Sequence, residues 1–430
     1  MIRSYTVARR EVDVAVPNRT RTAAASTAAT RCALALEYQK TLPGSNSWRR
    51  SSRTSTSLPP SSAYFSHEGL KFMAEVEPSR HWGSYGDYGC RLNALTVEEL
   101  FDRYARSRFL YPEKRARLAP YLAEIVDNWR RALGAGELII WFATHEEEVS
   151  GGWATVSGWR SSRTGWHNQH LVSNGSPTGT RAVMLAGQSA RLSDGNATSQ
   201  QNWFRRTNRF AARAFGTFVD RVTQDQTALI DYELLAVGCN LTFPAPEGVA
   251  VCAVEAGDKG QAAELQALAA EVRGPVFVAA EDLDGDDLLL DQVDQTYRLV
   301  GLRRYRPIWL AYDHGELAGA ALCYRAPLGF NFSFLENRCD LVVRAGPNAA
   351  RRSAVAAALL KAAQPIYGDI STHYIPLVTD SHTAATVVAM GAEAVRSYSQ
   401  SIWLRAAFSA WYDHIDEIYA RRLSRHPGVG

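Results

Sequence analysis

The sequence predicts a mixed α/β fold in which one order of helices and strands occurs twice, after an N-terminal tail without regular structure. From about residue 76 onward, apolar residues recur at helical or strand spacing, whereas the preceding stretch shows neither period. Residues 240–248 contain two prolines and little periodicity, and they separate two stretches with similar element orders. We therefore expect a disordered tail over residues 1–75 and two domains, 76–243 and 244–430, each a mostly antiparallel mixed sheet flanked by helices.

The tail is basic and rich in Ser and Thr. Residues 1–62 hold ten basic and three acidic residues, and their Arg/Ser runs cannot bury enough surface to offset chain entropy. Three interpretations stay open: an organelle transit peptide, a basic arm that contacts nucleic acid or anionic lipid, or a translated upstream region with the functional start near Met73. The other 368 residues carry 37 basic and 41 acidic groups. We therefore expect no nucleic-acid partner for the folded part.

The overall composition is that of a globular protein, and we expect it to be cytoplasmic. Of 430 residues, 46% are apolar and 21% charged. No apolar stretch reaches the length of a membrane-spanning helix, so we expect no membrane partner. Six cysteines without C-x-x-C spacing or neighbouring His ligands argue against a disulfide scaffold and against a zinc site, and we expect no metal.

Helix and strand signals fill the first predicted domain. Thr96 and Glu99 form a capping-box pattern at the start of a helix, and apolar residues at helical spacing continue over 111–133. Residues 137–143 and 152–158 are predicted strands joined by a polar turn. Further predicted elements are a strand at 181–185, a helix at 208–222 and a strand at 228–237.

The second predicted domain repeats this order of helices, meander and strand–helix–strand unit. Its elements are, in order, a strand at 249–254, helices at 258–272 and 288–304, strands at 308–312, 318–324 and 339–343, a helix at 349–363, a strand at 374–378, a helix at 383–390, a strand at 395–404 and a helix at 411–423.

The most informative segment leads from the strand 339–343 through a short loop into the helix 349–363. The first turns of that helix contain small residues, and Arg351 and Arg352 stand near its entrance. A helix N-terminus presents free backbone N–H groups and the positive end of the helix dipole. The segment therefore predicts a phosphate-binding loop.

This segment resembles the acyl-CoA pyrophosphate motif of the GCN5-related N-acetyltransferase (GNAT) superfamily, Gln/Arg-x-x-Gly-x-Gly/Ala. The matching residues are Arg351, Arg352, Ser353, Ala354, Val355 and Ala356. Ala354 stands where the superfamily prefers Gly. Residues 380–392 resemble a second segment of the superfamily, and Gly391 matches it, but Val387 occupies the place of the Tyr that serves as general acid.

The resemblance covers residues 248–405 and implies an acyl-CoA-dependent N-acyltransferase that forms a ternary complex. The donor would be acetyl-CoA or another acyl-CoA, and the acceptor a small-molecule or peptide amine. Backbone amides of Val342 and Val343 would bind the pantetheine arm, and residues 351–356 would hold the pyrophosphate. Because the amine must lose a proton, a carboxylate or a water relay is needed, and Glu336 and Asp340 are the candidate catalytic residues.

The first predicted domain resembles the superfamily more weakly. Residues 206–211 occupy the same frame, but Arg209 stands where Gly is needed and would obstruct the approach of a phosphate. The resemblance therefore implies a tandem protein with one working and one degraded cofactor loop. The alternative is a catalytically inactive, GNAT-like pseudoenzyme that binds a ligand or a partner protein, as the departures at Ala354 and Val387 suggest.

Overall fold

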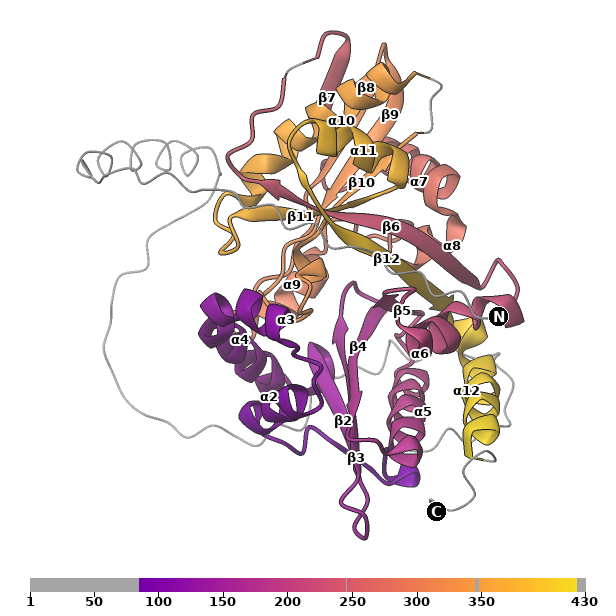
Figure 1. Cartoon of the computed structure of the whole chain (residues 1–430). Helices are drawn as coiled ribbons and strands as arrows, with labels where there is room; N and C mark the ends of the chain where they lie inside the picture. The colour runs from indigo at the N-terminus through magenta and orange to yellow at the C-terminus, as the bar shows by residue number, and fades with distance from the viewer. Residues whose placement is uncertain (1–84, 245, 345–347, 424–430) are drawn as a thin grey trace, which may run out of the picture. The chain divides into compact units, whose positions relative to one another are not determined.

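The computed structural model describes residues 85–244, 246–344 and 348–423, so the tail predicted over residues 1–75 lies outside the described residues. Residues 73–430 group into one compact unit. Its described part holds a twelve-stranded mixed sheet with helices on both faces (Figure 1). One sheet thus runs through both predicted domains, and the boundary expected near residue 243 stays a prediction. It falls in the loop between the sixth and seventh strands.

The strands follow one another across the sheet in an order that differs from their order in the chain. They are β1 (Cys90–Leu92), β2 (Ile140–Glu146), β3 (Trp153–Arg160), β4 (Gly165–Ser173), β5 (Ser199–Phe204), β6 (Thr227–Gly238), β7 (Val249–Ala253), β8 (Ile308–Asp313), β9 (Glu316–Cys323), β10 (Cys339–Val343), β11 (Tyr374–Thr379) and β12 (Glu393–Leu404). The order across the sheet is β1-β2-β3-β4-β5-β12-β6-β11-β10-β9-β8-β7. The helices are α2 (Val97–Arg106), α3 (Pro112–Leu118), α4 (Leu122–Gly134), α5 (Pro177–Ser193), α6 (Arg209–Ala211), α7 (Lys259–Arg273), α8 (Pro275–Ala280), α9 (Asp291–Arg298), α10 (Ala349–Ala363), α11 (Ser381–Ala389) and α12 (Phe408–Leu423).

The sheet is symmetrical about its two central strands, β12 and β6. In each half one pair is parallel, β4 with β5 and β10 with β11, and the other pairs are antiparallel. β6 comes from the first half of the chain but pairs with β11 of the second, and β12 of the second half pairs with β5 of the first. The two halves therefore exchange their last strands at the centre of the sheet, as the crossing of β6 and β12 in Figure 1 shows.

Alternating residues of β2 show how helices cover the first half. Trp141 and Ala143 pack with Val183 of α5, whereas Ile140 and Phe142 belong to a cluster with residues of α2 and α4. Because successive side chains of a strand point to opposite faces, α5 covers one face of the sheet and α2 and α4 cover the other.

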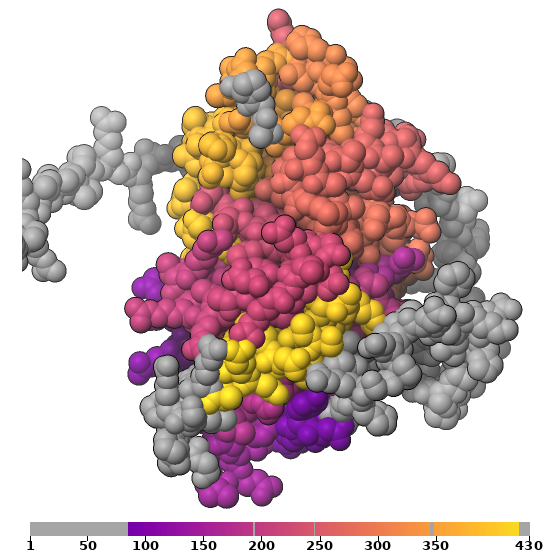
Figure 2. All heavy atoms as spheres, turned by 90° about the vertical axis from the view of Figure 1, so that its right-hand side faces the viewer, coloured from indigo at the N-terminus to yellow at the C-terminus, as the bar shows by residue number. Residues whose placement is uncertain are grey.

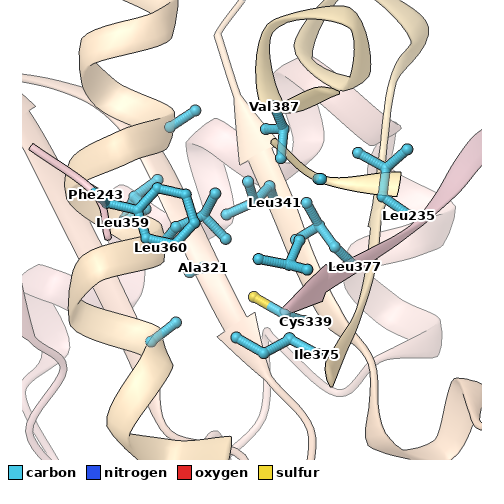
Figure 3. Close-up of a cluster of buried hydrophobic side chains, with 14 of the residues drawn as sticks. Leu235, Phe243, Ala321, Cys339, Leu341, Leu359, Leu360, Ile375, Leu377 and Val387 are labelled. Carbon is cyan, nitrogen blue, oxygen red and sulfur yellow. The ribbon is translucent and has the colours of Figure 1, made fainter. Parts of the chain in front are cut away.

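The second half has the same two-faced arrangement. Leu341 of β10 and Leu377 of β11 pack with Leu359 of α10 and Val387 of α11 (Figure 3). Val342, the next residue along β10, packs in a separate cluster with side chains of α7 and α8. β10, all of whose residues are buried, is therefore covered on both faces.

The structure confirms the predicted strands of the second half, but the helix expected at 288–304 spans only Asp291–Arg298, and α8 is not predicted. It also confirms the capping box of α2, in which the Thr96 hydroxyl accepts the Glu99 N–H at 3.2 Å. The strand predicted at 181–185 is wrong, because these residues lie inside α5. A short apolar run cannot by itself distinguish a strand from a buried helix. The sequence prediction also misses β1, β4 and β5.

The C-terminal helix α12 packs against α5, and Figure 2 shows the yellow C-terminal segment at the surface beside the magenta residues of the first half. Within the part of the chain that the structure describes, no helix combines the length and apolarity needed to cross a membrane.

Candidate functional site

The candidate site lies where the parallel strands β4 and β5 separate. They pair only over Gly165–His167 and Ser199–Gln201. Beyond these residues β4 stays paired with β3, and β5 with β12. The facing edges of residues 168–173 and 202–204 have no strand partner in the described sheet. The sheet therefore opens into a fork with unpaired backbone edges, which we call the first fork.

A bulge in β4 marks the first fork. The pairing of β3 with β4 shifts between Thr155 and Ser157, opposite His170, and His170 has a φ of +52°. A left-handed residue within a strand is typical of a β-bulge, which bends the strand and redirects its backbone groups. β10, the equivalent strand of the second half, pairs with β9 without such a shift.

Polar side chains hold the closed end of the first fork. Ser199 Oγ and Gln201 Nε2 donate to the Ala280 carbonyl at 3.2 and 3.0 Å, and Gln400 Nε2 donates to Gln201 Oε1 at 2.5 Å. These hydrogen bonds tie β5 to α8 and β12. They explain how a strand with few apolar residues is buried in the middle of the sheet.

A cavity of about 500 Å³ passes through the first fork. Met184 of α5 and Phe215 line it on one face of the sheet, and Phe109 and Phe332 line it on the face of α2 and α4. The cavity is therefore lined from both faces of the sheet. Its size and its mixture of apolar and polar lining are typical of small-molecule sites.

The loop 329–335 of the second half forms one wall of this cavity. The Phe332 N–H donates to His170 Nε2 at 3.5 Å, and Asn331 Nδ2 donates to Gln169 Oε1 at 3.1 Å. Both acceptors belong to β4. A loop of the second half thus closes a site whose strands belong to the first half.

Gly329 and Glu336 fix the two ends of this loop. Gly329 has a φ of +87°, and a Cβ there would lie 2.4 Å from Ile125, so only glycine fits. The Gly329 N–H donates to Glu336 Oε1 at 2.6 Å. The Glu336 side chain is fully buried, and burial raises its pKa to about 8. Glu336, predicted as catalytic, therefore contacts the loop and is not part of the cavity lining.

The cavity is positively charged. Its charged lining residues are Arg108, Lys114, Arg205 and Arg396, and none of the described lining residues is Asp or Glu. Lys114 Nζ lies 3.6 Å from the centre of the Phe109 ring, and Arg396 Nη1 donates to Tyr111 Oη at 3.3 Å. Burial, helped by the charges of Arg117 and Arg396, lowers the pKa of Lys114 to about 7.

The N-terminus of α5, which follows β4, already holds an anion. Ser176 caps the helix, and its Oγ accepts the Gly179 N–H at 2.8 Å. The Glu147 carboxylate accepts hydrogen bonds from the hydroxyls of Ser150 and Ser176, and these bonds lower its pKa. A carboxylate at this place stabilises the helix dipole.

The first-half counterpart of the predicted phosphate loop is not the expected one. Residues 206–211 follow β5, whereas the helix after the parallel strand β4 is α5, and the loop before it is 174–176. Arg209 therefore does not stand at the entrance of that helix, whose first turn contains Thr178 and Gly179. β4 and β5 are polar strands without a hydrophobic period, so the sequence prediction misses them. It therefore places the counterpart of the phosphate loop after β5 instead of after β4.

The second fork, between β10 and β11, is filled by side chains. Pairing ends at Asp340 and Val378, and the next carbonyl, that of Leu341, accepts hydrogen bonds from Thr379 Oγ1 at 3.0 Å and Arg273 Nη2 at 3.1 Å. Asp340, predicted as catalytic, is fully buried 3.5 Å from Arg273 Nη2. Burial raises the pKa of Asp340. Asp340 thus belongs to a buried ion pair on the α7 face.

The predicted cofactor residues lie at the end of β10 and in the first turns of α10. Val342 and Val343 are buried and pair with β9. Asn348 caps α10 by accepting the N–H groups of Ala350 and Arg351. Of the remaining predicted residues, Arg351, Arg352, Ser353 and Ala354 are half-buried, and Val355 and Ala356 are buried. Their role in holding CoA stays a prediction, and residues 345–347 lie outside the described chain.

Thr207, Asn208, Phe210 and Ala211 of the frame 206–211 line the cavity, whereas many of the other lining residues are absent from the predicted site. Lys114, His170, Phe332 and Arg396 come from four distant segments, and no local spacing links them. One signal in the sequence could have pointed to Lys114. Lys is rare in this chain, at five of 47 basic residues, and Lys114 lies three residues after Tyr111, close to a second aromatic residue, Phe109.

No protein-family model matches the sequence, and no curated protein matches it. Solved structures similar to this chain include a GCN5-related N-acetyltransferase from Sphaerobacter thermophilus, with 13% identity and a TM-score of 0.37 over 73% of this chain and 95% of that one. A tandem GNAT protein from the clavulanic acid biosynthesis pathway has 11% identity and a TM-score of 0.35 over 73% and 98%. A GCN5-related N-acetyltransferase-like protein from Streptococcus suis has 12% identity and a TM-score of 0.32 over 72% and 100%. These structures carry the name of the superfamily that the sequence motif resembles.

Proposed function

We propose that this chain transfers an acyl group from a CoA thioester to an amine in the cavity of the first fork. The observation that carries the proposal is the cavity itself, which passes between two parallel strands whose inner edges are unpaired. An extended pantetheine arm, rich in amide groups, can pair with such an edge as an added strand does. The acceptor can reach the same opening from the other face of the sheet.

The transfer does not need a carboxylate to take up the proton of the amine. The C–N bond forms as the thioester C–S bond breaks, and the proton lost by the amine is taken up by the departing thiolate. Ser333 Oγ and Tyr398 Oη lie 2.7 Å apart in the cavity lining and can pass this proton. Burial keeps the pKa of His170 well below its usual value, so His170 stays neutral and accepts the Phe332 N–H.

The second fork is the other candidate location for CoA, as the sequence predicts. The Asn348 cap and the small residues of α10 support it. The occupied carbonyl of Leu341 and the ion pair between Arg351 and Asp313 count against it, because both use groups that the cofactor would need.

Calorimetric titration with acetyl-CoA, using two matched variants, tests the location. Leu171→Trp places a large ring in the lining of the first fork, and Ala354→Leu places a larger side chain in the first turns of α10. We expect one molecule of acetyl-CoA per chain, lost in Leu171→Trp and kept in Ala354→Leu. The reverse pattern would move the site to the second fork. No binding to the unchanged protein would exclude acyl-CoA chemistry.

A pseudoenzyme is the second candidate function, and the Glu147 carboxylate at the α5 N-terminus favours it. This carboxylate occupies the place where a pyrophosphate would otherwise meet the helix dipole. A thiol-release assay across a panel of amines separates the two candidates. Binding of CoA without thiol release from acetyl-CoA supports the pseudoenzyme, whereas release that depends on an added amine excludes it.

A further inference from the structure

The most unusual feature of the cavity is a pair of cations without acidic partners. Lys114 and Arg396 approach Tyr111 from α3 and β12: Lys114 Nζ lies 5.9 Å from its ring centre, and Arg396 Nη1 donates to its hydroxyl. In the described part of the chain, neither cation has a carboxylate within ion-pair distance.

Buried cations elsewhere in this protein are compensated. Arg273 faces Asp340, and Arg338 Nη2 donates to Glu281 Oε1 at 2.7 Å. Arg304, fully buried, donates to two backbone carbonyls, those of Ser161 and Glu336. The fold thus supplies oxygen acceptors where cations serve structure, since an uncompensated buried charge is costly. Lys114 and Arg396, which are half-buried, have no such carboxylate in the described chain.

Aromatic rings surround Lys114. Lys114 Nζ lies within 6 Å of the ring centres of Phe109, Tyr111 and Phe332. Rings stabilise a cation only in part and leave its hydrogen-bond donors free. Their faces and edges also form an apolar wall, and aromatic rings pack well against a planar or apolar ligand body.

We propose that the acceptor substrate carries a small anionic group, a carboxylate or a phosphate monoester, beside a flat apolar body, and that Lys114 and Arg396 bind this group. The proposal rests on the acyl transfer proposed for the same cavity and names the class of its acceptor. A ligand anion would supply the negative charge that the cavity lining lacks.

The same cations favour the chemistry of an amine acceptor. An ammonium group near two positive charges loses its proton more readily, since like charges disfavour the charged form. The nucleophile is the neutral amine. An amine that also carries a carboxylate would be held by its anionic end while its amino group stays unprotonated, whereas a purely cationic acceptor would be repelled.

Binding of three matched probes to the full chain tests this proposal: phenylacetate, its uncharged analogue phenylacetamide, and phenyl phosphate. We expect calorimetry to show that an anionic probe binds at least about tenfold more tightly than the amide. If phenyl phosphate binds more tightly than phenylacetate, the acceptor is assigned to the phosphate monoesters. If phenylacetate binds more tightly, the acceptor is assigned to the carboxylates. Equal affinity for all three probes would overturn the proposal.

Two variants connect the effect to the named residues. Lys114→Met keeps the length and apolar contacts of the side chain, and Arg396→Gln keeps a donor toward Tyr111; each should weaken the anionic probe about tenfold and leave the amide unchanged. Lys361→Met, the same substitution at an exposed position of α10, is the control. Unchanged anion affinity in both cavity variants would overturn the assignment.

The pH dependence gives a second readout. The groups that face Lys114 are Arg117 on α3, Arg396 on β12, His170 on β4 and Tyr111. His170 is neutral in the range of interest. As the pH rises above 7, Lys114 loses its proton and no longer attracts the anion, so the affinity should fall by about tenfold in total, the loss expected for Lys114→Met. Lys114→Met should abolish this slope, and a slope that persists would contradict the role of Lys114.

Acetyl-CoA titrations on the same samples test the proposed acyl transfer separately from the proposed class of acceptor. If the unchanged protein binds acetyl-CoA but does not prefer the anionic probes, the proposed acceptor class is wrong and the proposed transfer stands. If the unchanged protein does not bind acetyl-CoA, the proposed transfer is wrong.

Discussion

The two forks of this sheet occupy equivalent places in a duplicated topology and yet differ in what fills them. The first fork has polar strands, a bulge at His170 and a cavity through the sheet. The second has an unbroken β10 and a core of Leu341 and Leu377 on one face (Figure 3). The Arg273–Asp340 pair lies on the other face. The second fork thus carries the motif at a helix N-terminus, whereas the first fork carries the space for a ligand.

The strongest test of this difference removes the cation that fills the second fork. Arg273→Met would leave Asp340 buried without its partner and free the Leu341 carbonyl, so we expect a loss of about 3–5 kcal/mol in the free energy of unfolding. Urea denaturation measures it. The control is Arg344→Met, which removes an exposed pair with Glu271 and should cost no more than about 1 kcal/mol. Similar small losses in both variants would show that the second fork does not depend on its ion pair.

The loop that closes the first fork gives the next largest effect. Gly329→Ala combines a left-handed backbone with a Cβ placed 2.4 Å from Ile125, so we expect about 2–4 kcal/mol of destabilisation and weaker binding of any acceptor. The control is Gly315→Ala, with a φ of +89° but open space around its Cβ. It should show only the backbone cost of about 1 kcal/mol. Equal effects would mean that the loop can move away from Ile125 without loss.

Sequence patterns could predict much of the fold, and the site was predictable only in part. The second half, whose strands are apolar, agrees with the predicted strands from β7 to β12. The sequence prediction missed the first fork because the buried residues of β5 are polar: Ser199, Gln200 and Gln201. Their burial depends on hydrogen-bond partners that are distant in the chain, such as the Ala280 carbonyl. Hydrophobic periodicity cannot register such long-range compensation.

The predicted catalytic pair shows the same limit. The spacing of Glu336 and Asp340 before the phosphate-loop motif is compatible with a base near a cofactor, and it is equally compatible with buried structural acids. Only the contacts to Gly329 and Arg273 distinguish these cases. Local sequence could therefore predict where acids lie along the chain, and it could not predict which way they face.

The pH dependence of stability at Glu336 separates a positioning role from a catalytic one. Its pKa of about 8 in the folded chain exceeds the ordinary value of 4.5, so the folded state binds the extra proton and the stability due to Glu336 is lost as pH rises from 4.5 through 8. The slope should approach about 1.4 kcal/mol per pH unit within this window. Glu336→Gln should remove this component of the pH dependence, measured by urea denaturation at several pH values, and should keep thiol release. Release abolished in a folded Glu336→Gln protein would restore the catalytic role.

The smallest expected effect decides which helix N-terminus meets the pyrophosphate. Glu147 places a carboxylate beside the Ser176 cap at the N-terminus of α5, where its charge would repel a phosphate. Glu147→Gln keeps the hydrogen-bonding shape and removes the charge. If the first fork holds CoA, affinity should rise about two- to fivefold, corresponding to the roughly 0.3–1 kcal/mol of a charge at a helix end. Glu148→Gln, the exposed neighbour in the same turn, should leave affinity unchanged. Calorimetry at low ionic strength measures the difference, because salt screens it. Intact CoA binding with no response to Glu147→Gln would place the pyrophosphate away from α5, and the N-terminus of α10 would then be the remaining candidate.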